Sequence, residues 1–242
     1  MGKLVAYSGF SSTNYLEMPY NPDLDFGTGD FCVMGWGKES SNPTDEKIIE
    51  RDSATTAQRF TVAISGAGAL AFTCDDNTTT RQAFSSAVLD NGSWSHFVCV
   101  YDGAGGLQVY INGTLNGSAS GAALLTLNNA NAILRVGLGV SGSNQLASGS
   151  LALLRVSSTA PTADQIAKIY NDEKVLFQDN AQATLYGASD AVTALAHDPV
   201  TNILSVGTSA GRSDFQGLRR VSNTETAVTT AISASNGLIV EE

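Results

Sequence analysis

Apolar and polar residues alternate along most of the chain in short runs that turn residues separate. The clearest runs are 97–101 and 107–111, which flank a turn rich in aspartate and glycine. The second run ends in Asn112-Gly113, a pair that tolerates the positive φ values of a two-residue hairpin turn. The stretch 94–115 therefore predicts one β-hairpin that leads directly into a second.

Similar runs recur on both sides of this stretch. Residues 31–36 are almost continuously apolar, so a strand buried on both faces, at the centre of a sheet, is expected there. Further strands are expected at 47–50, 60–64, 70–72, 84–88, 124–127, 133–136 and 151–156. A series of short strands with small-residue turns predicts an all-β fold built as an antiparallel sandwich.

The sandwich is expected to end in a short helix. Thr162 and Gln165 have the spacing of a capping box, and Ile166, Ile169 and Tyr170 share one helical face through about Glu173. Two domains are expected: a β-sandwich over residues 1–176 and a small β domain over residues 177–242.

The second domain holds five short strand candidates and a loop expected at 211–217. This series of short strands resembles one blade of a β-propeller with part of a second. Because a lone blade cannot bury both faces, it is expected to dock on the sandwich, on copies of itself, or on a following piece of chain.

Charge and composition exclude some classes of function. The net charge is −10, which argues against a nucleic-acid partner, because such affinity comes largely from clustered lysine and arginine. No apolar run approaches the ~20 residues that span a bilayer, and Met1-Gly2-Lys3 lacks the pattern of a signal peptide. Neither membrane insertion nor signal-directed export is therefore expected. The sequence is expected to be a fragment of a longer chain.

Three cysteines cannot pair completely. Cys32 and Cys99 lie in apolar strand runs, where a small buried thiol is the ordinary role, and a metal site lacks the required cysteine and histidine spacing. The pattern indicates folding in a reducing cytoplasm.

One family resemblance rests on the central hairpins. Trp94 with His96, the turn 101–103 and the ending 109–113 resemble laminin-G-like domains, within the concanavalin A-like lectin/glucanase superfamily. The strand 31–36 that ends in Trp36, and a closing strand followed by a short helix, extend the resemblance over about residues 8–176. It implies a jelly-roll sandwich, a fold that hosts lectins, adhesion modules, glycosidases and structural spacers.

A glycosidase of this superfamily would need paired carboxylates on one strand. Glu50-Arg51-Asp52 is a partial match to the family motif, but the position of its third acid is Thr55. This segment is therefore expected to be a surface turn. Both histidines, His96 and His197, are expected to be structural.

The resemblance also implies calcium held by loop carboxylates. Asp75, Asp76 and Asn77 provide hard oxygen ligands in one loop and are the candidate site; the alternative is a solvated polar turn, since one loop rarely fills six to eight positions. Sugar binding would need an exposed aromatic ring, and both Trp36 and Trp94 are expected in the core. No glycan-binding residue is assigned.

The whole arrangement, a sandwich, a short helix and a small-residue tail ending in 236–242, resembles the distal part of phage or prophage tail and fibre proteins. This implies a non-catalytic virion structural or receptor-facing module, assembled in the bacterial cytoplasm as a homo-oligomer, with a trimer favoured. The alternatives are a calcium-assisted lectin-like module of a bacterial protein, with a cell-surface glycan as partner, and a degenerate glycoside hydrolase.

Overall fold

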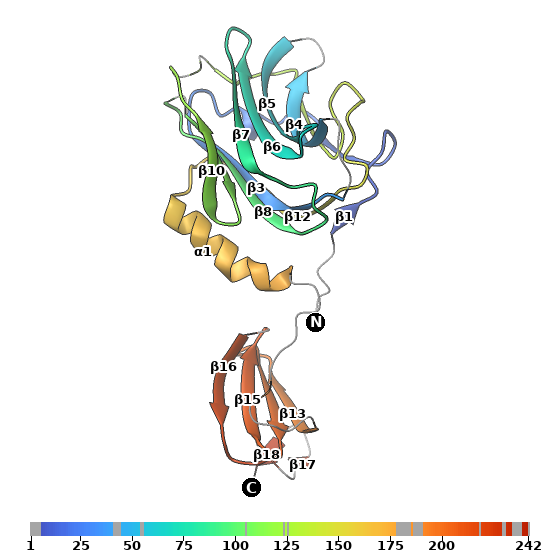
Figure 1. Cartoon of the computed structure of the whole chain (residues 1–242), viewed down its shortest axis with the longest axis vertical. Coiled ribbons are helices and arrows are strands. Elements are labelled where there is room, and N and C mark those ends of the chain that lie inside the picture. Colours follow the sequence, from blue (N-terminus) through green and yellow to red (C-terminus); the bar gives the residue numbers. More distant parts are fainter. Residues whose placement is uncertain are drawn as a thin grey trace. The chain divides into compact units, whose positions relative to one another are not determined.

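The strands of the first unit assemble into two antiparallel sheets that face each other (Figure 1). The computed structural model describes residues 6–40, 45–53, 56–104, 106–122, 124, 126–177, 185, 191–217, 219–228, 231–233 and 239–241. The chain divides into the units Met1–Phe177 and Gln178–Glu242. Among the described residues, no helix is both long and apolar enough to cross a bilayer.

The first sheet has the spatial order β1-β12-β3-β8-β9-β10. Its strands are β1 (Tyr7–Ser8), β3 (Phe31–Lys38), β8 (Ser95–Tyr101), β9 (Leu107–Ile111), β10 (Thr114–Ala119) and β12 (Ser150–Ser157). The two predicted hairpins are confirmed, and Asn112 and Gly113 take φ values of 50° and 80° at the second turn. Strand β3 lies inside the sheet, as its apolar run predicted.

The second sheet has the order β2-β11-β4-β5-β6-β7. Its strands are β2 (Leu16–Met18), β4 (Glu46–Ser53), β5 (Thr56–Ile64), β6 (Ala69–Asp76), β7 (Thr80–Val88) and β11 (Ile133–Val136). A short 3₁₀ helix, η1 (Pro22–Leu24), follows β2. These two sheets confirm the all-β, jelly-roll-like sandwich.

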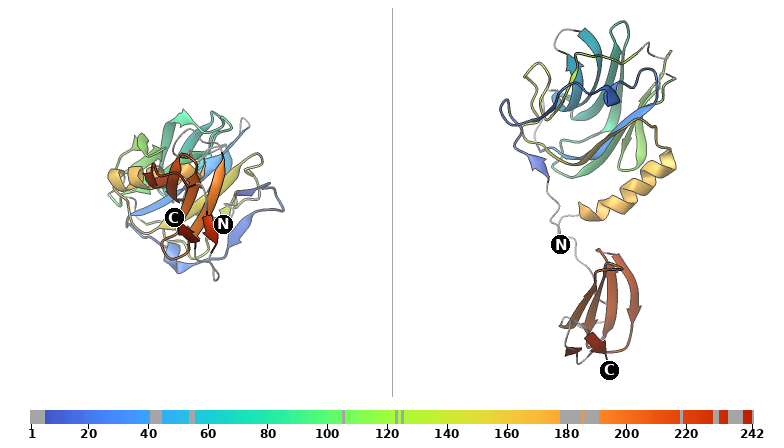
Figure 2. Two further views of the ribbon diagram at one scale, coloured as in Figure 1. Left: turned by 90° about the horizontal axis from the view of Figure 1, so that it is seen from below. Right: turned by 180° about the vertical axis from the view of Figure 1, so that it is seen from behind.

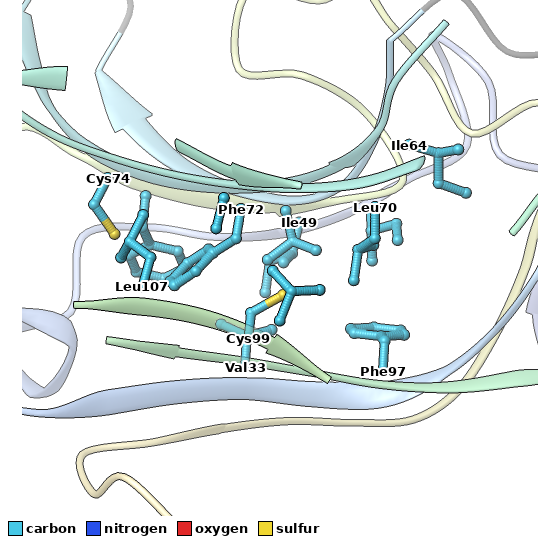
Figure 3. Close-up of a cluster of buried hydrophobic side chains, with 14 of the residues drawn as sticks. Val33, Ile49, Ile64, Leu70, Phe72, Cys74, Phe97, Cys99 and Leu107 are labelled. Carbon is cyan, nitrogen blue, oxygen red and sulfur yellow. The ribbon is translucent and has the colours of Figure 1, made fainter. Parts of the chain in front are cut away.

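The core lies between the sheets, where side chains from both inner faces interdigitate (Figure 3). Val33, Phe97 and Cys99 reach into it from the first sheet, and Leu70 and Phe72 from the second. All three cysteines are free and buried.

Helix α1 (Ala163–Glu173) covers the outer face of the first sheet (Figures 1 and 2). Its capping box is confirmed, because Thr162 Oγ1 accepts from Gln165 N and Gln165 Oε1 accepts from Thr162 N, at 3.3 Å and 2.8 Å. The fully buried Ile166 packs against the outward side chains Met34 and Val98. Strands β3 and β8 are therefore buried on both faces, which explains their continuous apolar sequences. The 3₁₀ helix η2 (Lys174–Leu176) follows directly.

Two strand predictions were wrong. No described residue of 124–127 belongs to a strand; Leu124 and Leu127 instead fill the core from an irregular segment. Conversely, the loop expected at 211–217 contains strand β15 (Gly211–Gln216). Its central Asp214 is nearly buried and accepts from the hydroxyls of Ser205 and Ser222 at 2.6 Å each, so a polar sequence is satisfied inside a sheet.

The second unit contains a four-stranded antiparallel sheet in the order β13-β14-β15-β16, the meander of a propeller-type blade. Its remaining strands are β13 (Val192–Asp198), β14 (Ile203–Thr208) and β16 (Arg219–Thr224). A separate two-stranded sheet pairs β17 (Ala231–Ser233) with β18 (Ile239–Glu241).

A buried arginine joins β4 to the loops at one end of the sandwich. The Arg51 guanidinium donates to the carbonyls of Leu127 and Asn129 at 3.0 Å and 3.2 Å, and it pairs with the Asp25 carboxylate. Asp25 also accepts from Asn129 N and the Tyr20 hydroxyl. Burial opposes ionisation of Asp25, but these partners together lower its pKa below the ordinary value.

We expect Arg51→Leu to lower the free energy of unfolding by about 3–5 kcal/mol, because it leaves the carbonyls of Leu127 and Asn129 without their buried donor and the partly buried Asp25 carboxylate without its ion-pair partner. The matched Arg59→Leu, on the neighbouring strand β5, removes ion pairs of 3.4 Å and 3.7 Å from a partly exposed side chain and should cost under about 1 kcal/mol. Urea unfolding followed by tryptophan fluorescence measures both, since Trp36 and Trp94 lie in this unit. Equal losses would contradict the role of Arg51.

His96 lies fully buried under α1, against the rings of Trp36 and Tyr170, and neither of its ring nitrogens has a hydrogen-bond partner. Burial lowers the pKa of His96 to about 4; the carboxylate of Glu173 opposes this shift and the guanidinium of Arg155 adds to it. The unfolded chain takes up a proton near pH 6.5, well before the folded chain does. Stability present above pH 6.5 is therefore lost as the pH falls toward 4.

We expect His96→Phe to flatten this acid-side loss, because phenylalanine keeps an aromatic ring in the pocket and removes the titrating group. Melting temperatures at pH 7.5 and 5.0 measure the effect. The control is His197→Phe, which removes an exposed imidazole and leaves His96 in its pocket, so the acid-side loss should remain. An unchanged slope in His96→Phe would refute the assignment.

Candidate binding groove

The outward face of the second sheet carries a polar groove with a volume of about 390 Å³. Its floor is a row of side chains at facing register positions on four neighbouring strands: Glu50 on β4, Thr61 on β5, Thr73 on β6 and Gln82 on β7. Successive strand residues point to opposite faces, so the residues between them serve the core. The sequence alternation thus makes one face apolar and the other hydrogen-bonding.

The floor is held in place by its own hydrogen bonds. Glu50 Oε1 accepts from Thr61 Oγ1 at 3.2 Å, and Glu50 Oε2 accepts from Val140 N at 2.7 Å. Gln82 Nε2 donates to Thr73 Oγ1 at 3.0 Å. A ligand would therefore meet prearranged groups, which lowers the entropy cost of binding.

A charged row lies beside this floor. The Arg59 guanidinium lies 3.7 Å from an oxygen of Asp52 and 3.4 Å from an oxygen of Asp75. Burial raises the pKa of Asp52 to about 6, and the nearby charge of Glu50 adds to the rise while Arg59 opposes it. Acidic groups outnumber basic groups in this part of the sheet.

Phe84 provides an aromatic ring at the groove. It faces Ala71 across the β6–β7 pair, and the small side chain of Ala71 leaves the ring 48% exposed. Phe84 was not among the residues that the sequence predicted for a site. The available signal was its place in β7, where Phe84 shares the outward face with Thr80 and Gln82.

Neither tryptophan offers such a platform. Trp36 is buried as predicted, stacks on Phe177 with a centroid distance of 4.0 Å and donates from Nε1 to Glu173 Oε2 at 2.8 Å. Trp94 is half-buried and packs against the same Phe177 ring.

The expectation of a surface turn at Glu50-Arg51-Asp52 was wrong. All three residues belong to β4, with Arg51 pointing inward and the flanking carboxylates on the groove side. The reason is the register of β4, which pairs Glu50 with Thr61 and Arg51 with Phe60. Thr55, where the family motif has its third acid, lies outside the described residues.

The candidate calcium residues close the turn between β6 and β7. Asp75 accepts from Asn77 N and Thr80 Oγ1 at 2.8 Å each, and Asp76 Oδ1 accepts from Thr78 N and Thr79 N at 2.8 Å and 2.7 Å. Asn77 has a left-handed φ of 72°. Both oxygens of Asp75 and one oxygen of Asp76 already accept hydrogen bonds, so a calcium ion would have to share these oxygens with their donors or displace the donors.

Nowhere in the described chain, this turn included, do three or more histidine, cysteine, aspartate or glutamate side chains gather that could hold a metal. Calcium at Asp75, Asp76 and Asn77 stays a prediction.

Comparison with known proteins places the sandwich in a family. A family model described as the concanavalin A-like lectin/glucanases superfamily matches residues 10–167. Among curated proteins, none matches the sequence.

Several solved structures share the fold. The binding domain of Paraclostridial Mosquitocidal Protein 1 is 11% identical with a TM-score of 0.58, over 99% of this chain and 61% of that one. A structure of botulinum neurotoxin type C, whose cell entry depends upon interaction with two ganglioside molecules, is 15% identical with a TM-score of 0.52, over 83% and 50%. Domains LG4-5 of the mouse laminin alpha1 chain are 14% identical with a TM-score of 0.52, over 66% and 43%.

At these identities the likeness shows the fold alone. The chain spans at most 61% of the length of each of these three structures.

Proposed function

The chain belongs to the concanavalin A-like lectin/glucanase superfamily, and we propose that it is a non-catalytic, receptor-facing module that binds a carbohydrate in the groove of the second sheet. The observation that carries this proposal is the Phe84 ring beside a row of fixed hydrogen-bonding side chains. A sugar ring has one apolar face and a rim of hydroxyls, and these two surfaces match that pairing.

The size and charge of the groove narrow the class of ligand that it can bind. A volume of about 390 Å³ falls in the range of small-molecule sites. The lining acids Asp45 and Glu50, with Asp52 and Asp75 beside them, outnumber Lys47 and Arg59. Neutral oligosaccharides are therefore the expected class, because an acidic sugar would meet repulsion here.

The relatives support a binding role. They include a toxin binding domain and laminin domains, and the neurotoxin type C structure concerns ganglioside-dependent cell entry.

The glycosidase alternative has the pair Glu50 and Asp52 in its favour. Two hydrogen bonds hold Glu50 in the groove floor, and Arg59 lies beside Asp52 in the charged row, so both carboxylates have structural partners.

We expect Phe84→Ala to weaken the affinity for a neutral oligosaccharide by about tenfold, equal to ~1.4 kcal/mol, because the ring loses its contact with the sugar face. Val88→Ala is the matched control, since Val88 lies on the same strand with the same 48% exposure and does not line the groove. A glycan array selects the sugar, and titration calorimetry measures both variants.

Two further experiments separate the proposed module from the calcium-assisted lectin and from the glycosidase. Binding that EDTA abolishes and calcium restores would favour the calcium-assisted lectin, and release of reducing sugar would revive the glycosidase. Absence of binding to any glycan, or equal loss in Phe84→Ala and Val88→Ala, would overturn the proposed site.

The proposal also places the module in a virion, on a phage or prophage tail fibre, as a homo-trimer held through the second unit. This placement is supported by the order of a sandwich, a short helix and a small β unit along the chain, which resembles the distal part of such fibres. In the described part of the second unit, several large apolar side chains are exposed, namely Val192, Leu195, Val200 and Val221.

We expect sedimentation to give three times the chain mass for residues 1–242 and the monomer mass for a chain that ends at Phe177. In the trimer of the full chain, contacts between second units would cover their exposed apolar side chains. The shortened chain lacks this unit and has no such contacts. A monomeric full chain at all concentrations would exclude the trimer.

A further inference from the structure

The sandwich has a second cavity, of about 420 Å³, at the edge where both sheets end in their shortest strands. It lies between β1 and β12 of the first sheet and β2 and β11 of the second, and Ile49 of β4 forms part of its wall. Strands β1 and β2 are the edge strands, so no other described strand closes the gap. The cavity shares no lining residue with the polar groove.

Ten described residues line this cavity and all are apolar, the single aromatic among them being Tyr7. Tyr7, Leu16 and Leu153 are exposed by 60%, 44% and 37% at its mouth. Large apolar side chains that remain in water around an open apolar cavity indicate a place for an apolar ligand, because their contact with water is unfavourable.

The backbone at the mouth is strained. Leu153 has a left-handed φ of 50°, which L residues other than asparagine and aspartate rarely adopt, and the register of β12 shifts between Ala152 and Arg155. Backbone strain of this kind often occurs at binding sites. Here it lies where an exposed leucine meets the cavity.

The dimensions favour one kind of occupant. A helix has a diameter of about 10–12 Å and cannot enter between sheets packed roughly 10 Å apart. A protein interface needs about 20–30 residues a side, far more than this cavity provides. Water would find few polar partners on this mainly apolar lining, whereas an apolar cavity of about 150 Å³ already holds benzene.

We propose that this cavity binds the alkyl chain of a free single-chain amphiphile, with the polar head left in solvent at the mouth. The absence of charged side chains from the described lining disfavours a buried head group. The cavity takes one chain, so a two-chain lipid held in a bilayer does not fit. This site is independent of the carbohydrate groove.

The test is titration calorimetry with dodecyl octaethylene glycol ether below its micelle concentration, with octaethylene glycol alone as the head-group control. The wild-type chain should bind the ether at one site with a negative heat-capacity change, and the chain-free glycol should give no signal. Phosphatidylcholine vesicles titrated in the absence of the ether should give no binding signal.

Leu16→Asp should weaken ether binding about tenfold or more, because it places a charge at the mouth of an apolar site. The matched control is Leu115→Asp, on the edge strand β10 at 49% exposure, which should change the affinity less than about twofold. Equal effects of the two variants, or no binding by the wild-type chain, would overturn the proposal.

Leu153→Gly adds a readout that a purely structural role would not give. Glycine adopts a positive φ without strain, so the melting temperature should stay or rise, while the affinity for the ether should fall several-fold as the leucine contact is lost. A fall in melting temperature with unchanged affinity would assign Leu153 to stability alone.

Discussion

The buried guanidinium of Arg51 sets the position of β4, and much of the sandwich depends on that position. Its three acceptors come from two loops distant in sequence, around Asp25 and around Leu127 to Asn129. With Arg51 pointing inward, Glu50 and Asp52 must point outward, since successive strand residues alternate. A slip of one residue would move the acids into the core and is excluded by the cost of burying them.

Strand β4 therefore contributes to three environments at once. Ile49 serves both the core and the wall of the apolar cavity, Arg51 closes the end of the sandwich, and Glu50 forms part of the groove floor. Because these side chains share one short strand, the geometry of the groove and of the cavity is coupled to the packing of the core. Rigid elements of this kind hold binding groups more accurately than loops do.

The two sheets differ in what covers them. The first is covered on its outer face by α1, so that β3 and β8 are apolar on both sides and His96 is isolated from water. The second leaves its outer face open over the groove, and this face carries the threonines, the charged row and Phe84. Solved structures that are only 11–15% identical share the fold, because many sequences satisfy the core, whereas the proposed binding depends on the residues of the open face.

Local chemistry decided which elements form. The turn at Asn112-Gly113, the capping box of Thr162 and Gln165, and the apolar run of β3 all depend on neighbours in the sequence, and the sequence alone predicted them correctly. Strand β15 escaped prediction because the hydroxyls that satisfy Asp214 come from the two adjacent strands. The tertiary structure decided three other features. These are the inward direction of Arg51, the placement of the acids and Phe84 on one open face, and the cavity at the edge of the two sheets. Each depends on contacts between distant residues, as with Arg51 and Leu127, 76 positions apart, and no local pattern encodes such pairs.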